Sequence, residues 1–221
     1  MDERKSGSRK REKTLLVALL LSSPGPVLTG IAAVTSLSAT QIADFLRRSA
    51  ELVALFVSWW IYRKIQNNPH IETPRRDKMT RFANKTVSIA MICSGIAMMT
   101  VGLFRIFFYT VNGNVVLGYV IAILGLITNA WFWWRYGSLN RETFDPVIES
   151  QQKLYRAKAC VDLTVVIALT SVLIAPQNPA TRYIDSAGCI IVAFYLAFSG
   201  IGMLREQKPL EKTENASEQL P

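Results

Sequence analysis

Four ionisable side chains lie within one otherwise apolar stretch of the chain. They are Asp44, Arg47, Arg48 and Glu51, and the hydrophobic run that contains them ends near Tyr62. A charge at bilayer depth costs about 3 kcal/mol or more, so such residues usually face a protein interior or a water-filled path. This stretch is therefore the first place to look for function.

A second charged pair, Lys158 and Asp162, opens another apolar run. Arg47 and Glu51 are four residues apart, as are Lys158 and Asp162, and this spacing puts two side chains on one face of a helix. Unpaired charges at this depth would be costly, so we expect pairing within the cluster. Arg47 would pair with Glu51 or Asp162, and Lys158 with Asp162 or Glu51.

Buried carboxylates beside bases are groups whose protonation can be coupled to movement, which favours a transport site or a proton relay. Two alternatives remain. The pairs could simply hold the two helices together, or Arg47 and Lys158 could extend to opposite membrane interfaces.

Two further polar residues are secondary candidates. Asn129 could donate a hydrogen bond to the charged cluster, or it could link two helices. Asp44 is expected near the outer surface, either as a solvated helix start or N-cap or as part of an entry path. The only histidine, His70, falls in a polar loop and is expected to be solvated.

The composition narrows the class of protein. Half of the 221 residues are hydrophobic and the mean hydropathy is +0.23, which indicates a membrane protein. The net charge of +9 is spread between apolar runs instead of forming one face, so we expect no nucleic-acid partner. The three cysteines show no CxxC spacing, which argues against a disulfide framework or a cysteine-built zinc site. There is no nucleophile and base pair and no glycine-rich phosphate loop, so we expect neither an enzyme nor a cofactor.

The apolar runs predict an all-α, polytopic membrane protein with six transmembrane helices. The expected spans are residues 15–35, 41–63, 85–109, 115–136, 158–175 and 183–204. The sequence Ser23-Pro24-Gly25-Pro26 must kink the first span, because proline removes a helix hydrogen bond and clashes with the preceding turn. The basic start and short leucine-rich core of this region also fit a cleaved signal peptide.

The distribution of basic residues predicts the orientation. Most Lys and Arg side chains fall in the leader, in residues 64–84 and 137–157, and in the tail, while the alternate loops hold almost none. Both termini should therefore be cytoplasmic, in a multi-pass protein of the plasma membrane. The expected organisation is a basic leader at 1–14, a transmembrane domain at 15–206 and a short disordered tail at 207–221.

Several of these features occur together in a known family. They are Ser36-Leu37-Ser38-Ala39 before Ala43-Asp44, the late Asn129, the Lys158 to Asp162 spacing, Asp185 at the start of the last span, and Ser199-Gly200-Ile201-Gly202-Met203-Leu204-Arg205-Glu206 at its end. In this order the chain resembles the transmembrane domain of the cation diffusion facilitators over residues 15–206. The resemblance implies a dimeric divalent-cation/proton antiporter. It also implies a tetrahedral intramembrane site, built from His or Asp four residues before an Asp on the second and fifth helices.

The chain departs from this pattern at the site itself. Arg47 and Lys158 stand where the family has its first ligands, while Glu51 and Asp162 keep acids at the second positions and are the candidate metal ligands. A guanidinium cannot bind a metal, an ammonium must first lose its proton, and two ligands fall short of the four usual for zinc.

Two hypotheses follow from this departure. One is a cation transporter, possibly a cation/proton antiporter, in which Arg47 and Lys158 tune or gate the two acids. Its expected partners are a divalent cation, protons, the lipid bilayer and a second copy of the chain. The other is a non-transporting scaffold or partner subunit whose former site is a salt-bridge lock.

Overall fold

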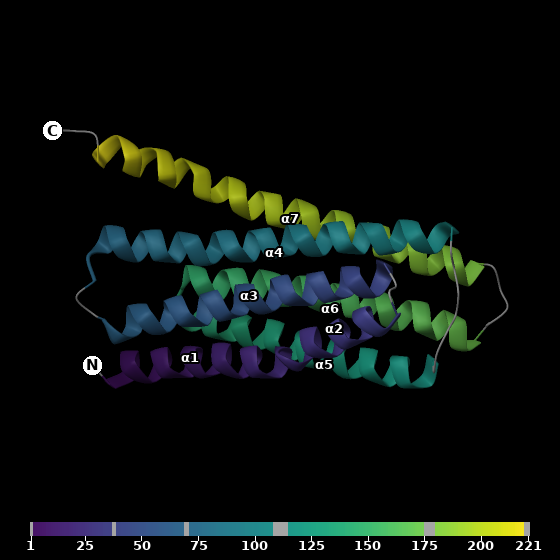
Figure 1. Cartoon of the computed structure of the whole chain (residues 1–221). Coiled ribbons are helices and arrows are strands. Elements are labelled where there is room, and N and C mark those ends of the chain that lie inside the picture. The colour runs from purple at the N-terminus through teal and green to yellow at the C-terminus, as the bar shows by residue number, and fades with distance from the viewer. Residues whose placement is uncertain (1, 37–38, 69–70, 108–114, 175–179, 219–221) are drawn as a thin grey trace.

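The computed structural model describes residues 2–36, 39–68, 71–107, 115–174 and 180–218, and every element in these ranges is a helix. The helices are α1 (Asp2–Ser22), α2 (Pro24–Ser36), α3 (Ala39–Asn67), α4 (Thr73–Phe107), α5 (Val115–Glu142), α6 (Pro146–Ile174) and α7 (Ala180–Glu218). They form one elongated bundle (Figure 1). The all-α class predicted from the sequence is confirmed.

The first apolar run is broken at Ser23, between α1 and α2. Pro24 has no N–H to offer the carbonyl of Leu20, and the hydroxyl of Ser23 donates to that carbonyl at 2.9 Å instead. Pro24 then serves as the first residue of α2, a position where its missing N–H costs nothing. The kink expected at this sequence is thus a complete break, and it lies about midway along the bundle.

The long helices run along the length of the bundle in alternating directions. In Figure 1, α2 continues from α1 toward the other end of the bundle, and the start of α1 lies at the same end as the end of α7. Helix α4 packs mainly against α7 and α3, and α5 packs mainly against α6. The number of membrane crossings, expected from the sequence to be six, stays a prediction.

The surface of the bundle is apolar along much of its length. Within the described residues, Gly7–Ile31, Thr73–Phe104 and Ser186–Gln207 are long and apolar enough to cross a membrane. Large hydrophobic side chains stand exposed on different helices, among them Leu28, Ile96, Ile127 and Phe198. Such a surface suits hydrocarbon, where the helices satisfy their backbone hydrogen bonds internally.

The leader is helical, and the tail differs from the sequence-based expectation. Helix α1 already begins at Asp2, and α7 continues to Glu218 through the tail that was expected to be disordered. In the leader, Arg11 is buried and donates to the carbonyls of Leu139 and Thr143 at the end of α5. A guanidinium at a helix C-terminus satisfies carbonyls that have no partner within the helix, and this contact anchors α1.

Two hydrophobic clusters fill the interior. One joins α3, α4, α6 and α7 and includes Met91, Leu154 and Leu196. The other joins α1, α3, α4, α5 and α6 and includes Phe132, Tyr136 and Tyr155, whose rings stack or tilt against one another at centroid distances of 5.0 to 6.1 Å. The charged stretch identified in the sequence lies beside this aromatic cluster.

Candidate charged site between α3, α5 and α6

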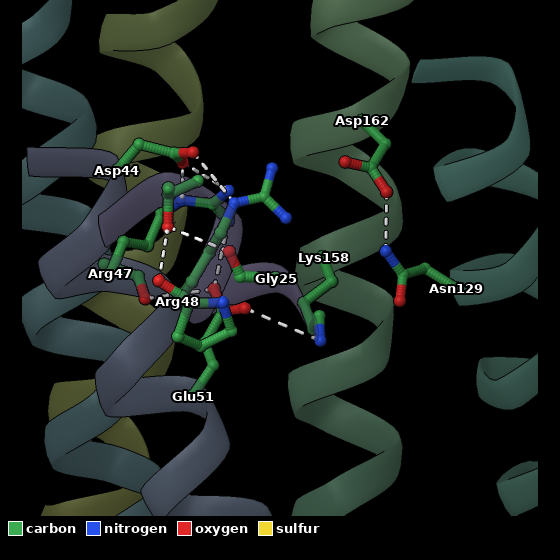
Figure 2. Close-up of polar contacts among 11 residues, drawn as sticks. Gly25, Asp44, Arg47, Arg48, Glu51, Asn129, Lys158 and Asp162 are labelled. Carbon is green, nitrogen blue, oxygen red and sulfur yellow. Dashed lines mark hydrogen bonds and ion pairs between the residues drawn. The ribbon is translucent and has the colours of Figure 1, made fainter. Parts of the chain in front are cut away.

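One face of α3 carries a continuous ladder of ion pairs (Figure 2). Asp44 accepts hydrogen bonds from Arg47 and Arg48, with the closest nitrogen of each at 2.8 Å. Arg47 also donates to Glu51 Oε1 at 3.0 Å. These spacings of three and four residues bring the side chains to one face of the helix, as the sequence indicates.

Lys158 of α6 joins this ladder from across the interior. Its ammonium lies 3.5 Å from Glu51 Oε2 and 4.7 Å from the ring centroid of Tyr155. The side chains of Arg47, Glu51 and Lys158 are only 8, 6 and 11% exposed. The predicted contact between the second and fifth spans is therefore a buried pair of Lys158 with Glu51.

The register of α3 against α6 follows from two matched contacts. The amide of Gln151 donates to the hydroxyl of Ser58 at 2.8 Å, and both side chains are fully buried. Ser58 lies seven residues after Glu51, and Lys158 lies seven residues after Gln151, so the two contacts are two helical turns apart on antiparallel helices. The start of α6 is itself fixed, because Asp145 Oδ1 caps the backbone N–H groups of Val147 and Ile148 at 2.9 and 3.3 Å.

Glu51 is fully engaged. In addition to Arg47 and Lys158, it accepts a hydrogen bond from the hydroxyl of Ser94 on α4 at 3.2 Å. Oε1 therefore receives two donors and Oε2 faces the ammonium. Three helices hold this carboxylate.

Asp162 stands apart from these pairs. Asn129 of α5 donates to Asp162 Oδ2 at 2.5 Å, and Figure 2 shows the two side chains facing each other across α5 and α6. Among the side chains that the structure describes, no base lies within ion-pair distance of Asp162. A Cβ atom on Gly125, one turn before Asn129, would come within 3.2 Å of Oδ2, so this glycine leaves room for the carboxylate.

A cavity of about 240 Å³ connects the ion pairs around Glu51 with the contact between Asp162 and Asn129. It is lined by Arg47, Arg48 and Glu51 from α3, by Gly125, Thr128 and Asn129 from α5, by Lys158 and Asp162 from α6, and by Leu21, Ser22 and Gly25 at the α1–α2 break. The site thus has water-sized space next to its charged groups, and the break in the first apolar run forms part of its wall.

The structure brings together all six candidates named from the sequence. Arg47, Glu51, Lys158 and Asp162 share the cavity, Asn129 reaches Asp162, and Asp44 belongs to the ladder of α3. Asp44 lies inside α3, which begins at Ala39, so it is not the N-cap. His70 and the side chain of Asp185 lie outside the described part of the chain.

Sequence reasoning missed one ion pair and two further contributors. Arg48 pairs with Asp44 at a spacing of four residues, a signal that was present in the sequence. Ser94 and Gly125 gave no signal, because neither residue type nor spacing marks them as neighbours of a carboxylate.

The donor set does not match the tetrahedral metal site that the resemblance implies. Within the described residues, no group of three or more His, Cys, Asp or Glu side chains is placed to hold a metal ion. Glu51 is occupied by bases and a hydroxyl, and the acid of the cavity without a base among the described side chains is Asp162, whose partner is an amide.

A long helical bundle with an apolar surface and a charged internal cavity defines a multi-pass membrane protein. The family comparison gives the class: residues 15–209 match the cation efflux transmembrane domain. The chain therefore belongs to the cation efflux family and is a membrane protein of the ion-transport class. A search of curated proteins gives no match.

Proposed function

We propose that this protein moves a cation across the plasma membrane in exchange for protons, with Asp162 as the carboxylate that receives the cation. Family membership supports cation transport. The observation that supports this particular site is that Asp162 faces the cavity without a basic partner among the described side chains, while Glu51 is held by two bases.

The remaining charges have a role in this scheme. Arg47 and Lys158 hold Glu51 in place, and Lys158 also presents a positive charge to the cavity that Asp162 lines. An incoming cation competes with these bases for the acids of the site. Glu51, Asp162 and Lys158 are the groups able to carry the exchanged protons, because an arginine stays protonated.

A second copy of the chain is part of the proposal, since the family resemblance implies a dimer. The cavity is built from α1, α2, α3, α5 and α6 of one chain, so each copy would carry its own site.

Flux measured in proteoliposomes tests the proposal. Purified protein is reconstituted, several cations are offered outside, and the internal pH is recorded at the same time. Cation entry opposed by proton exit supports antiport. Absence of flux for every cation, from protein shown to be folded, excludes transport by this chain alone.

Asp162→Asn is the most informative variant. Because Asp162 has no ion pair among the described side chains, neutralising it should cost little stability but should abolish flux. Asp77→Asn is the matched control, since Asp77 is exposed in the first turns of α4.

The scaffold hypothesis is the alternative, and the complete engagement of Glu51 favours it. A scaffold built on a salt-bridge lock predicts the opposite pattern. Asp162→Asn would then change neither flux nor stability, and only variants of Arg47, Glu51 or Lys158 would have an effect, namely on unfolding.

A further inference from the structure

A second hollow lies on the outside of the bundle, where the end of α5 packs against the start of α6. It has a volume of about 630 Å³ and shares no lining residue with the charged cavity. We call it the tryptophan cleft. Its lining residues are Trp133, Trp134, Gly137, Ser138, Arg141 and Glu142 of α5 and Gln152 of α6.

We propose that the tryptophan cleft binds the headgroup of a zwitterionic phospholipid. The phosphate would face Arg141, and the ammonium group would face Glu142 and the two indole rings. This inference is independent of the function proposed above, because it concerns a different surface and is measured without flux.

The first argument is the pair of opposite charges in the cleft. Arg141 and Glu142 are both exposed, and neither forms an ion pair with another side chain in the described ranges. A guanidinium can donate two parallel hydrogen bonds to a phosphate, and a carboxylate accepts hydrogen bonds from an ammonium group. A zwitterionic headgroup carries both of these charges, whereas a purely anionic headgroup would meet Glu142 as a like charge.

The second argument is the aromatic wall. Trp133 and Trp134 are 40 and 66% exposed. The face of a tryptophan ring attracts cations, and aromatic side chains are the usual partners of quaternary ammonium groups. Tryptophan also gathers at the depth of the lipid headgroups, because its ring is apolar and its N–H is polar. The fourth span predicted from the sequence ends at residue 136, which places the cleft at this depth.

The third argument is an exposed stripe that leads along α5 into the cleft. Its members are 50 to 66% exposed and follow one another at spacings of three and four residues: Leu124, Ile127, Trp131 and Trp134. The next positions on the same helix face are Ser138 and Arg141 of the cleft. Toward the end of α5 this face therefore changes from aliphatic to aromatic and then to polar and charged. A phospholipid has the same order of groups from its acyl chains to its headgroup, so one molecule can lie along the whole face.

The fourth argument is the space at the base of the cleft. A Cβ atom on Gly137 would lie 3.0 Å from the amide nitrogen of Gln152, so the glycine leaves room for this amide. The amide of Gln152 and the hydroxyl of Ser138 are uncharged donors, which can bond to phosphate or ester oxygens. They leave the charge balance of the cleft unchanged.

Lipid binding to the full chain in detergent tests the inference. Phosphatidylethanolamine, phosphatidylcholine and phosphatidylglycerol are added in equal amounts, and native mass spectrometry identifies each bound lipid by its mass. We expect the two zwitterionic lipids to bind about tenfold more tightly than phosphatidylglycerol. Equal affinities, or a preference for phosphatidylglycerol, would overturn the proposal.

Two charge variants locate the site. Glu142→Gln removes the partner of the ammonium group and should erase the preference for zwitterionic lipids. Arg141→Gln should weaken the binding of all three lipids about tenfold. Arg205→Gln is the matched control, because Arg205 is an exposed arginine near the end of the apolar stretch of α7. Equal effects of Arg141→Gln and Arg205→Gln would mean that lipid binds to basic side chains in general, which contradicts a site in the cleft.

Trp134→Ala tests the aromatic wall without changing any charge. It should weaken the binding of phosphatidylcholine more than that of phosphatidylethanolamine, because a quaternary ammonium depends on the ring face while a primary ammonium can also donate to Glu142. Folding of each variant is checked by its unfolding in detergent, apart from lipid binding. Unchanged affinity of folded Trp134→Ala protein for both lipids would refute a contact between the indole and the headgroup.

Discussion

Glycine residues have different structural roles in two regions of this bundle. Between α4 and α7 they bring backbones together: a Cβ atom on Gly95 would lie 2.9 Å from the carbonyl oxygen of Ala193, and one on Gly200 would lie 2.8 Å from that of Ser88. Around the charged cavity they make space for side chains instead. Cβ atoms on Gly25 and Gly125 would meet the tips of Arg48 and Asp162 at 3.5 and 3.2 Å.

The difference separates the structural half of the molecule from the half that holds the candidate site. In α4 and α7, close approach strengthens dispersion contacts between helices, which is how membrane helices associate when lipid is as apolar as their side chains. In α3, α5 and α6, the packing is relaxed around charges and a cavity remains. We therefore expect substitutions in the first region to act on stability and substitutions in the second to act on flux, with Glu51 as the exception.

The largest effect is expected for Glu51→Ala. Removing this carboxylate leaves the buried Arg47 and Lys158 without their common partner, and breaking a buried pair costs about 3 to 5 kcal/mol. Unfolding in detergent measures the loss, and Glu72→Ala is the control because Glu72 is exposed. Equal stability of the two variants would show that the ladder on α3 contributes nothing to folding.

Gly95→Ala should give the next largest loss. The new methyl group would collide with backbone atoms of Ala193 and Ala197, which cannot move as a side chain can, and overpacking costs about 1 to 3 kcal/mol. Gly202→Ala is the matched control on α7, since a Cβ there has nothing within 4 Å. It should leave stability unchanged or raise it by up to about 1 kcal/mol through helix propensity. A stable Gly95→Ala protein would refute the close packing of α4 on α7.

Gly125→Ala is the same substitution in the region of the charged cavity. It should change flux instead of stability. Its methyl group would contact the end of the Asp162 side chain, which can rotate away, so the stability change should stay within about 1 kcal/mol. Flux should fall about tenfold, because the carboxylate would leave its position beside Asn129. Unchanged flux would show that the position of Asp162 is not critical for transport.

Much of this arrangement could be predicted from the sequence, for a physical reason. The period of the α-helix places Arg47 with Glu51, and Lys158 with Asp162, on single faces before any fold is known. The two prolines after Ser23 likewise predict, from local sequence alone, that the helix of the first apolar run is interrupted. The same helical spacing of four residues also predicts the pair of Asp44 with Arg48, which the sequence analysis overlooked.

The rest depends on how helices are rotated against each other. The sequence left open whether Lys158 pairs with Glu51 or with Asp162, because both acids are within reach of a long side chain. The structure selects Glu51, while Asp162 turns toward Asn129 on α5. Only this packing makes Ser94 and Gly125 neighbours of the carboxylates, and no local sequence pattern predicts them.

Ser94→Ala should produce the smallest effect and the sharpest test of how the two regions connect. Ser94 and Gly95 are neighbours on α4, yet Ser94 donates to Glu51 on α3 while Gly95 contacts α7. Glu51 keeps both of its bases in the variant, so we expect a loss of about 1 kcal/mol in the free energy of unfolding.

A double-mutant cycle with Glu51→Ala isolates the contact between Ser94 and Glu51. If the hydroxyl acts through the carboxylate, Ser94→Ala should cost nearly nothing once Glu51 is gone. Additive losses would mean that Ser94 contributes only to the packing of α4, and that the two regions are energetically separate.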